Sequence, residues 1–123
     1  MTRGPLPKKA IAQAREIALG RGPVLGTGDL TEPQCDLLIF SPGCTAYVHI
    51  RRIRTHVTSL QDFAREFGED IGRLRRLPQT PVTSREIWVL SPWNAWQYFR
   101  IYDDRLAEIR RDGATLTGTP SPG

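Results

Sequence analysis

The sequence has little cysteine, little lysine and no long apolar run, and each shortage excludes a class of protein. Its two cysteines, Cys35 and Cys44, are too few for a disulfide framework or a four-ligand zinc site. No apolar run approaches the roughly 18 to 20 residues that a membrane-spanning helix needs. The first residues are polar and rich in proline, so no signal sequence is recognisable. We therefore expect a cytoplasmic protein with reduced cysteines and no membrane contact.

Lysine is scarce but arginine is not, because 15 of the 17 basic residues are arginines and the formal net charge is +4. A guanidinium group presents a planar fork that donates two hydrogen bonds to a phosphate at once. This composition is compatible with a nucleic-acid partner. A charged, solvated surface would have the same composition, so charge alone leaves the partner open.

The length of 123 residues, with 39% hydrophobic and 24% charged residues, suits one globular domain. Residues 1–7 contain prolines and a glycine and are predicted to be a flexible lead-in. Residues 113–123 are mostly glycine, threonine, serine and proline, with little to bury, and are predicted to be a disordered tail. The single domain is therefore expected to be residues 8–112.

The spacing of apolar residues predicts two helices, one from Lys8 to a stop at Gly20 and one at residues 59–77. Four strands are predicted, at residues 35–40, 45–54, 86–90 and 95–102. Two shorter segments are less defined: residues 23–25 fit a short strand, and residues 105–111 fit either a strand or a short helix. A helix between the second and third of the four strands predicts a βαβ crossover, which places those strands side by side and parallel. The expected fold is a small α/β protein of α-β-β-β-α-β-β order, with a mixed sheet flanked by helices.

The segment 35–54 holds the residues best suited to chemistry. Asp36 is its only carboxylate and begins an apolar strand. His49 and Arg51 are two positions apart, so in an extended strand they project from the same face. Paired strands would bring the three side chains together, either as a site or as a result of amphipathic patterning.

A helix with Glu16, a strand that begins with Asp36, a strand with His49 and Arg51, and a helix leading to a further strand together resemble the PD-(D/E)xK nuclease superfamily. The small archaeal Holliday-junction-resolvase-like members are similar in size. The segment EIWVLSPWNAWQYFRI also looks like the late hairpin of small archaeal proteins related to that group. The resemblance covers roughly residues 8–111. It implies a restriction-endonuclease-like core and DNA or another nucleic acid as the partner.

By position, the resemblance implies that Glu16 is the helix acid of the motif and Asp36 its metal-binding aspartate. His49 and Arg51 stand where the family has an acid and a lysine. In the family, carboxylates hold Mg²⁺ beside the scissile phosphate, and the lysine orients or activates the attacking water. Imidazole is a poor ligand for Mg²⁺, and arginine stays protonated and cannot act as a base. The resemblance therefore implies a nuclease-like scaffold with a degenerate catalytic motif.

Retained cleavage would require a changed metal site that binds Mg²⁺ or Mn²⁺. Asp36, His49 and Glu16 could hold a metal that accepts mixed nitrogen and oxygen ligands, such as Mn²⁺. Alternatively, Asp29 or Glu32 in the preceding loop could supply the missing carboxylate. The sequence leaves open whether the protein is an enzyme.

Arg51, Arg52 and Arg54, with His56 close behind, are the candidate nucleic-acid-binding residues. Guanidinium groups at the end of a strand can bind a phosphodiester backbone. Charged residues on an edge strand also protect it from aggregation. We expect nucleic-acid binding on a degenerate nuclease-like scaffold. Two alternatives stay open: a metal-dependent endonuclease with an altered motif, and a non-enzymatic protein-interaction module.

The roles of Trp88, Trp93 and Trp96 are not assigned by the sequence. Two of the three lie in or beside a predicted turn, where an indole could stack on exposed bases. Such residues more commonly close a core or form a dimer contact, and Trp93 would be a natural contact in a homodimer.

Overall fold

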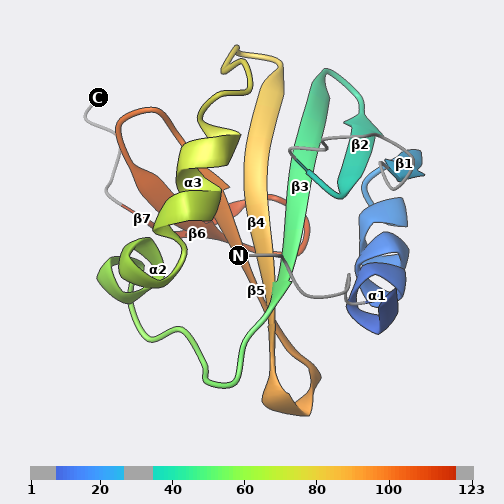
Figure 1. Cartoon of the computed structure of the whole chain (residues 1–123). Coiled ribbons are helices and arrows are strands. Elements are labelled where there is room, and N and C mark those ends of the chain that lie inside the picture. The colour runs from blue at the N-terminus through green and yellow to red at the C-terminus, as the bar shows by residue number, and fades with distance from the viewer. Residues whose placement is uncertain (1–7, 27–34, 119–123) are drawn as a thin grey trace.

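Alternating apolar residues build one β-sheet that is covered by helices on both faces (Figure 1). The computed structural model describes residues 8–26 and 35–118. In chain order its elements are α1 (Lys8–Leu19), β1 (Val24–Gly26), β2 (Leu37–Ser41), β3 (Cys44–Arg52), α2 (Leu60–Glu66), α3 (Gly68–Leu74), β4 (Thr83–Ser91), the short 3₁₀ turn η1 (Pro92–Asn94), β5 (Ala95–Ile101), β6 (Leu106–Ile109) and β7 (Thr115–Gly118). In this part of the chain, no helix is long and apolar enough to cross a membrane.

The strands lie in the sheet in their chain order, from β1 to β7. Neighbouring strands are antiparallel except β3 and β4, which are parallel and aligned from Thr45↔Thr83 to Arg52↔Leu90. The connection between these two strands carries α2 and α3. The predicted βαβ crossover is therefore confirmed, and so is the coarse expectation of a mixed sheet flanked by helices.

The two faces of the sheet have separate cores because side chains alternate along each strand. On β3, Val48 and Ile50 face α1, whose buried side is made of alanines. On β4, Ile87 and Val89 face the opposite way, toward α2 and α3. His49 and Arg51 alternate with Val48 and Ile50, so they lie on the α2 and α3 side of the sheet.

The helix predicted at residues 59–77 is two short helices rather than one. Its start is as expected, since the Ser59 Oγ accepts a hydrogen bond from the Asp62 backbone N–H at 3.0 Å. Phe67 leaves helical geometry, with φ −113° and ψ 26°, and separates α2 from α3. The break lets both helices keep their apolar side chains against the sheet: Phe63, Phe67, Ile71 and Leu74 are all buried.

The C-terminal part differs from the prediction of a tail beginning at residue 113. The ambiguous segment at 105–111 contains strand β6, and a turn at Arg110–Gly113 returns the chain so that β7 pairs with β6. Gly113 takes φ +95°, which glycine adopts without strain. The prediction failed here because strand pairing uses backbone groups and needs few buried side chains. The predicted lead-in at 1–7 and the last residues, 119–123, lie outside the described residues.

Candidate functional site

Four charged side chains converge on the α2 and α3 side of the sheet, and we call them the His49 cluster: Asp36, His49, Arg51 and Asp70. Asp36 directly precedes β2, His49 and Arg51 lie on β3, and Asp70 lies on α3. The His49 Nδ1 is 3.1 Å from the Asp36 Oδ2, and its Nε2 is 3.0 Å from the Asp70 Oδ1. The Arg51 Nη1 donates to the Asp70 Oδ2 at 2.5 Å. The helical connection therefore adds a second carboxylate to the three residues that the sequence had placed together.

Backbone contacts fix Asp36 in this cluster. Its N–H donates to the Val48 carbonyl at 2.7 Å, and its Oδ2 accepts from the Ile50 N–H at 2.7 Å. These bonds hold Asp36 against β3 immediately before the paired part of β2, which begins at Leu37↔Val48. The side chains of Asp36 and His49 are only 7% and 6% exposed, so most of the cluster is shielded from water.

The two carboxylates beside His49 favour the imidazolium form of its ring. A neutral imidazole has one N–H and one lone pair, so one carboxylate would face a lone pair; the protonated ring donates to both. Burial opposes the charged form, but hydrogen bonds and charge from Asp36 and Asp70 outweigh it and raise the pKa of His49 above 6.5.

Asp70 is ionised for the complementary reason. Burial alone would raise its pKa, but hydrogen bonds and positive charge from His49 and Arg51 lower it below its ordinary value of 3.8. A buried carboxylate with two cationic partners is a structural ion pair and is not suited to take up a proton near neutral pH.

The buried Cys35 does not offer a reactive thiolate. Neither Cys35 nor Cys44 forms a disulfide bond in the described part of the chain. Burial and the neighbouring Asp36 charge raise the pKa of the Cys35 thiol to about 11, so it stays protonated at neutral pH. Nucleophilic chemistry at Cys35 is therefore not supported.

The structure brings together Asp36, His49 and Arg51 but not Glu16. Glu16 is exposed on α1, which packs on the face of the sheet opposite to His49. The alternative ligands Asp29 and Glu32 lie outside the described residues.

Asp70 is the cluster member that sequence reasoning missed. It lies three residues after Phe67 and four before Leu74, which is the spacing of the buried face of α3. An acid at apolar-face spacing was the available signal, and the structure shows that it marks a buried ion pair.

The cluster does not fit a divalent metal ion in this arrangement. Both oxygens of Asp70 contact cations, and the Asp36 Oδ2 accepts from His49 and from the Ile50 backbone. A metal ion would have to displace His49 or Arg51 from the carboxylates. Among residues 8–26 and 35–118, no three histidine, cysteine or acidic side chains are arranged to hold a metal.

Arg51 connects the buried cluster to an exposed basic surface. Its side chain is 40% exposed, and its guanidinium carbon lies 5.5 Å from the centroid of the Phe67 ring. Arg52, Arg54 and His56 are exposed and make no side-chain hydrogen bond or ion pair within the described part of the chain. We call Arg51, Arg52, Arg54 and His56 the basic end of β3.

Two sets of hydrogen bonds hold the basic end of β3 against the hairpin of β4 and β5. The Ile53 N–H donates to the Leu90 carbonyl at 3.0 Å, immediately beyond the paired part of β3. The buried side chain of Gln97 accepts from the Val57 N–H at 3.0 Å and donates to the Val57 carbonyl at 2.9 Å. The segment between β3 and α2 is therefore tied at both ends.

A second buried charge cluster lies on the α1 side and was not anticipated. Glu86 is fully buried and accepts two hydrogen bonds from the Arg21 Nη1, at 2.9 and 3.0 Å. Ser84 and Trp88 donate to its two oxygens at 2.7 and 2.9 Å. These contacts tie the turn after α1 to β4, and the well-partnered carboxylate has a structural role.

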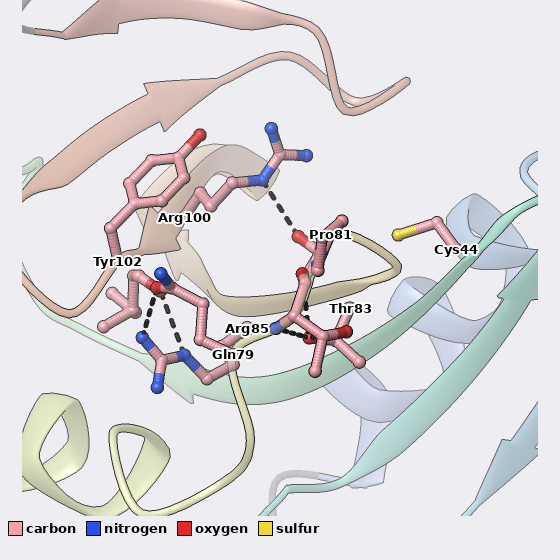
Figure 2. Close-up of a pocket in the computed structure, with 10 residues that line it drawn as sticks. Cys44, Gln79, Pro81, Thr83, Arg85, Arg100 and Tyr102 are labelled. Carbon is pink, nitrogen blue, oxygen red and sulfur yellow. Dashed lines mark hydrogen bonds between the residues drawn. The ribbon is translucent and has the colours of Figure 1, made fainter. Parts of the chain in front are cut away.

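Figure 2 shows the residues that line a pocket of about 520 Å³. This pocket lies at the end of the sheet opposite to the basic end of β3. Cys44 and Thr83 line it from the starts of β3 and β4, whereas Arg52 and Leu90 lie at the other ends of these strands. Arg100 also lines it and donates from its Nε to the Ser84 Oγ at 2.9 Å. The pocket is thus separate from the His49 cluster.

Comparisons with known proteins found no matching family model and no matching curated protein. Among solved structures, the chain is similar to Hjc, a Holliday junction resolvase from the archaeal hyperthermophile Archaeoglobus fulgidus. The sequence identity is 12% and the TM-score is 0.44, and the match covers 86% of this chain and 85% of that chain. Values this low assign neither an activity nor a partner.

Proposed function

We propose that this protein binds nucleic acid through its phosphate backbone at the basic end of β3, without metal-dependent cleavage. The observation that carries the proposal is a pre-positioned guanidinium group. Arg51 is fixed by Asp70 and by the Phe67 ring, yet 40% of its side chain is exposed. A fixed guanidinium loses less conformational freedom on binding a phosphate than a mobile one.

Charge at this end of the sheet also favours an anionic partner. Arg52 and Arg54 form no ion pair with the His49 cluster or with any other described residue, so no carboxylate neutralises them within the described part of the chain. The sequence has no acidic residue between Arg51 and Ser59 or between Ile87 and Tyr102. Phosphate groups are the anions that paired and exposed guanidinium groups bind best.

Burial argues against catalysis by the same cluster. The side chains of His49 and Asp70 are 6% and 8% exposed, and each is engaged with an oppositely charged neighbour. A phosphodiester would have to displace these contacts to reach a carboxylate. In this proposal the cluster is the support that positions Arg51.

DNA is the first partner to test, because the resemblance to the PD-(D/E)xK superfamily implies it. The restriction-endonuclease-like core, the cytoplasmic location and the homodimer remain predictions.

The proposal is tested by fluorescence anisotropy with labelled DNA. We expect the double variant Arg52→Ala/Arg54→Ala to bind at least tenfold more weakly than the wild type. The matched control is Arg73→Ala/Arg76→Ala, which removes the same charge from two exposed positions, one on α3 and one just after it. Equal losses for the two double variants would mean that only net charge matters, and the assignment to the basic end of β3 would fail.

The convergence of two carboxylates favours one second candidate, a metal-dependent endonuclease with an altered motif. Supercoiled and branched DNA would be incubated with the protein and Mg²⁺ or Mn²⁺. Cleavage that disappears in both Asp36→Asn and Asp70→Asn would support this candidate and overturn the non-catalytic proposal. Intact DNA in all samples supports binding without cleavage. A protein that binds no nucleic acid would instead favour the interaction module.

A further inference from the structure

Trp93 projects from the tip of the β4–β5 hairpin and is 95% exposed. Its backbone has φ 67° and ψ 25°, in the left-handed region that a bulky residue such as tryptophan rarely adopts. Asn94 follows with φ 57°, which asparagine adopts more readily. A large indole in such a conformation, with almost no contact with the protein, is unusual for a residue whose role is packing.

The hairpin holds Trp93 in this exposed position. Ser91 pairs with Ala95 across the two strands, and the Ser91 Oγ donates to the Ala95 carbonyl at 3.0 Å. The other two tryptophans are engaged differently: Trp88 is fully buried, and Trp96 is partly buried and stacks on Tyr98. Of the three, only Trp93 presents its ring to a ligand.

Trp93 and the basic end of β3 lie at the same end of the sheet. Arg52 pairs with Leu90 in the parallel register, and the Ile53 N–H bonds to the Leu90 carbonyl. The chain continues from Leu90 through Ser91 into the η1 turn that carries Trp93. Figure 1 shows the β4–β5 turn and the connection from β3 to α2 together at the lower end of the molecule.

We propose that Trp93 stacks on an unpaired base while Arg52 and Arg54 hold the neighbouring phosphates, so that the preferred ligand is single-stranded nucleic acid. This inference rests on the proposed function and names its substrate class. An indole stacks on the face of a base, and in a duplex those faces are covered by the adjacent base pairs. The positive charges of Arg52 and Arg54 beside Trp93 also disfavour a second copy of the chain as the ligand. In a symmetric dimer, the arginines of one copy would lie against the same arginines of the other and repel them.

The test compares Trp93→Ala with the wild type on a single-stranded oligothymidine, its RNA counterpart, a duplex and an abasic single strand. The wild type is expected to prefer single strands, and Trp93→Ala to lose about 5- to 100-fold in affinity for them. Binding to the duplex and to the abasic strand should not change. Trp93→Phe should retain most of the affinity because it keeps a ring that stacks.

Two controls separate this inference from the proposed function. Val82→Ala removes another exposed apolar side chain, 56% exposed, from the position just before β4, at the end of the strand opposite to Trp93, and should bind like the wild type. If Arg52→Ala/Arg54→Ala weakens binding and Trp93→Ala does not, base stacking is rejected and phosphate binding stands. If the wild type binds no nucleic acid, both proposals fail. If Trp93→Ala instead converts a dimer to a monomer in sedimentation, Trp93 is a self-association contact and the stacking role is overturned.

Discussion

At the scale of single residues, His49 has the most consequential environment. Its ring lies between two carboxylates, and those carboxylates raise its pKa above 6.5. A group whose pKa is higher in the folded state stabilises that state fully below its unfolded pKa. The stabilisation is lost as the pH rises through the folded pKa. Asp70 has the opposite shift, so its contribution is present above about 3.8 and is lost as the pH falls through its lowered folded pKa.

We therefore predict that the free energy of unfolding of the wild type falls, relative to His49→Gln, as the pH rises above 6.5. The neutral glutamine cannot gain or lose a proton, so the variant lacks the pH-dependent stabilisation that His49 provides. Urea unfolding at a series of pH values between about 5 and 9 measures the difference.

His56→Gln is the control, because His56 is exposed and lies outside the cluster. Its curve should run parallel to that of the wild type. If the His49→Gln curve also runs parallel to the wild type, the imidazolium interpretation is wrong.

The substitution Gly22→Ala tests the close approach of the backbone at residue 22 to the backbone of β2. A Cβ at this position would collide with the backbone carbonyl of Phe40, next to the point where the Phe40 N–H donates to the Pro23 carbonyl at 2.8 Å. Gly22→Ala should destabilise the protein by about 1–3 kcal/mol, because a main-chain atom must move. Thermal unfolding measures the loss of stability. An unchanged Tm would show that the edge strand β1 can shift away from Phe40 without loss of stability, and the prediction would be wrong.

At the scale of elements, the α3 helix carries a glycine that packing does not require. A Cβ at Gly72 would meet no atom within 4 Å, and its φ lies outside the left-handed region. We predict that Gly72→Ala stabilises the protein by about 0.5–1 kcal/mol, because alanine restricts the unfolded chain and favours the helix. Denaturant unfolding tests this, with Gly22→Ala as the contrasting variant. A loss of stability would mean that α3 needs the flexibility of glycine.

The elements differ in how well the sequence predicts them. Strands β3 and β4 have strong alternation and a helical segment between them, so their parallel pairing follows from the pattern. The break at Phe67 does not follow, because the apolar spacing from Phe63 to Leu74 continues across it. Strand β7 was missed because its sequence is mostly polar and has no clear apolar alternation. It is a strand because its backbone pairs with β6.

At the scale of the whole molecule, convergence of side chains was predictable only in part. His49 and Arg51 share a face because they are two positions apart, and pairing of β2 with β3 adds Asp36. The spacing of Asp70 marks it as buried, but its contact with His49 and Arg51 arises from the packing of α3 on the sheet, which no local pattern specifies. The same limit applies to Glu86, whose partner Arg21 is 65 residues away in sequence.

The salt dependence of DNA binding tests the central claim most directly. Each phosphate that a cationic side chain neutralises contributes about −0.9 to the slope of log K against log salt concentration for duplex DNA. The account predicts that Arg52→Ala/Arg54→Ala reduces the magnitude of the wild-type slope by about 2, while Arg73→Ala/Arg76→Ala leaves it unchanged. Equal slopes for the wild type and Arg52→Ala/Arg54→Ala would contradict it.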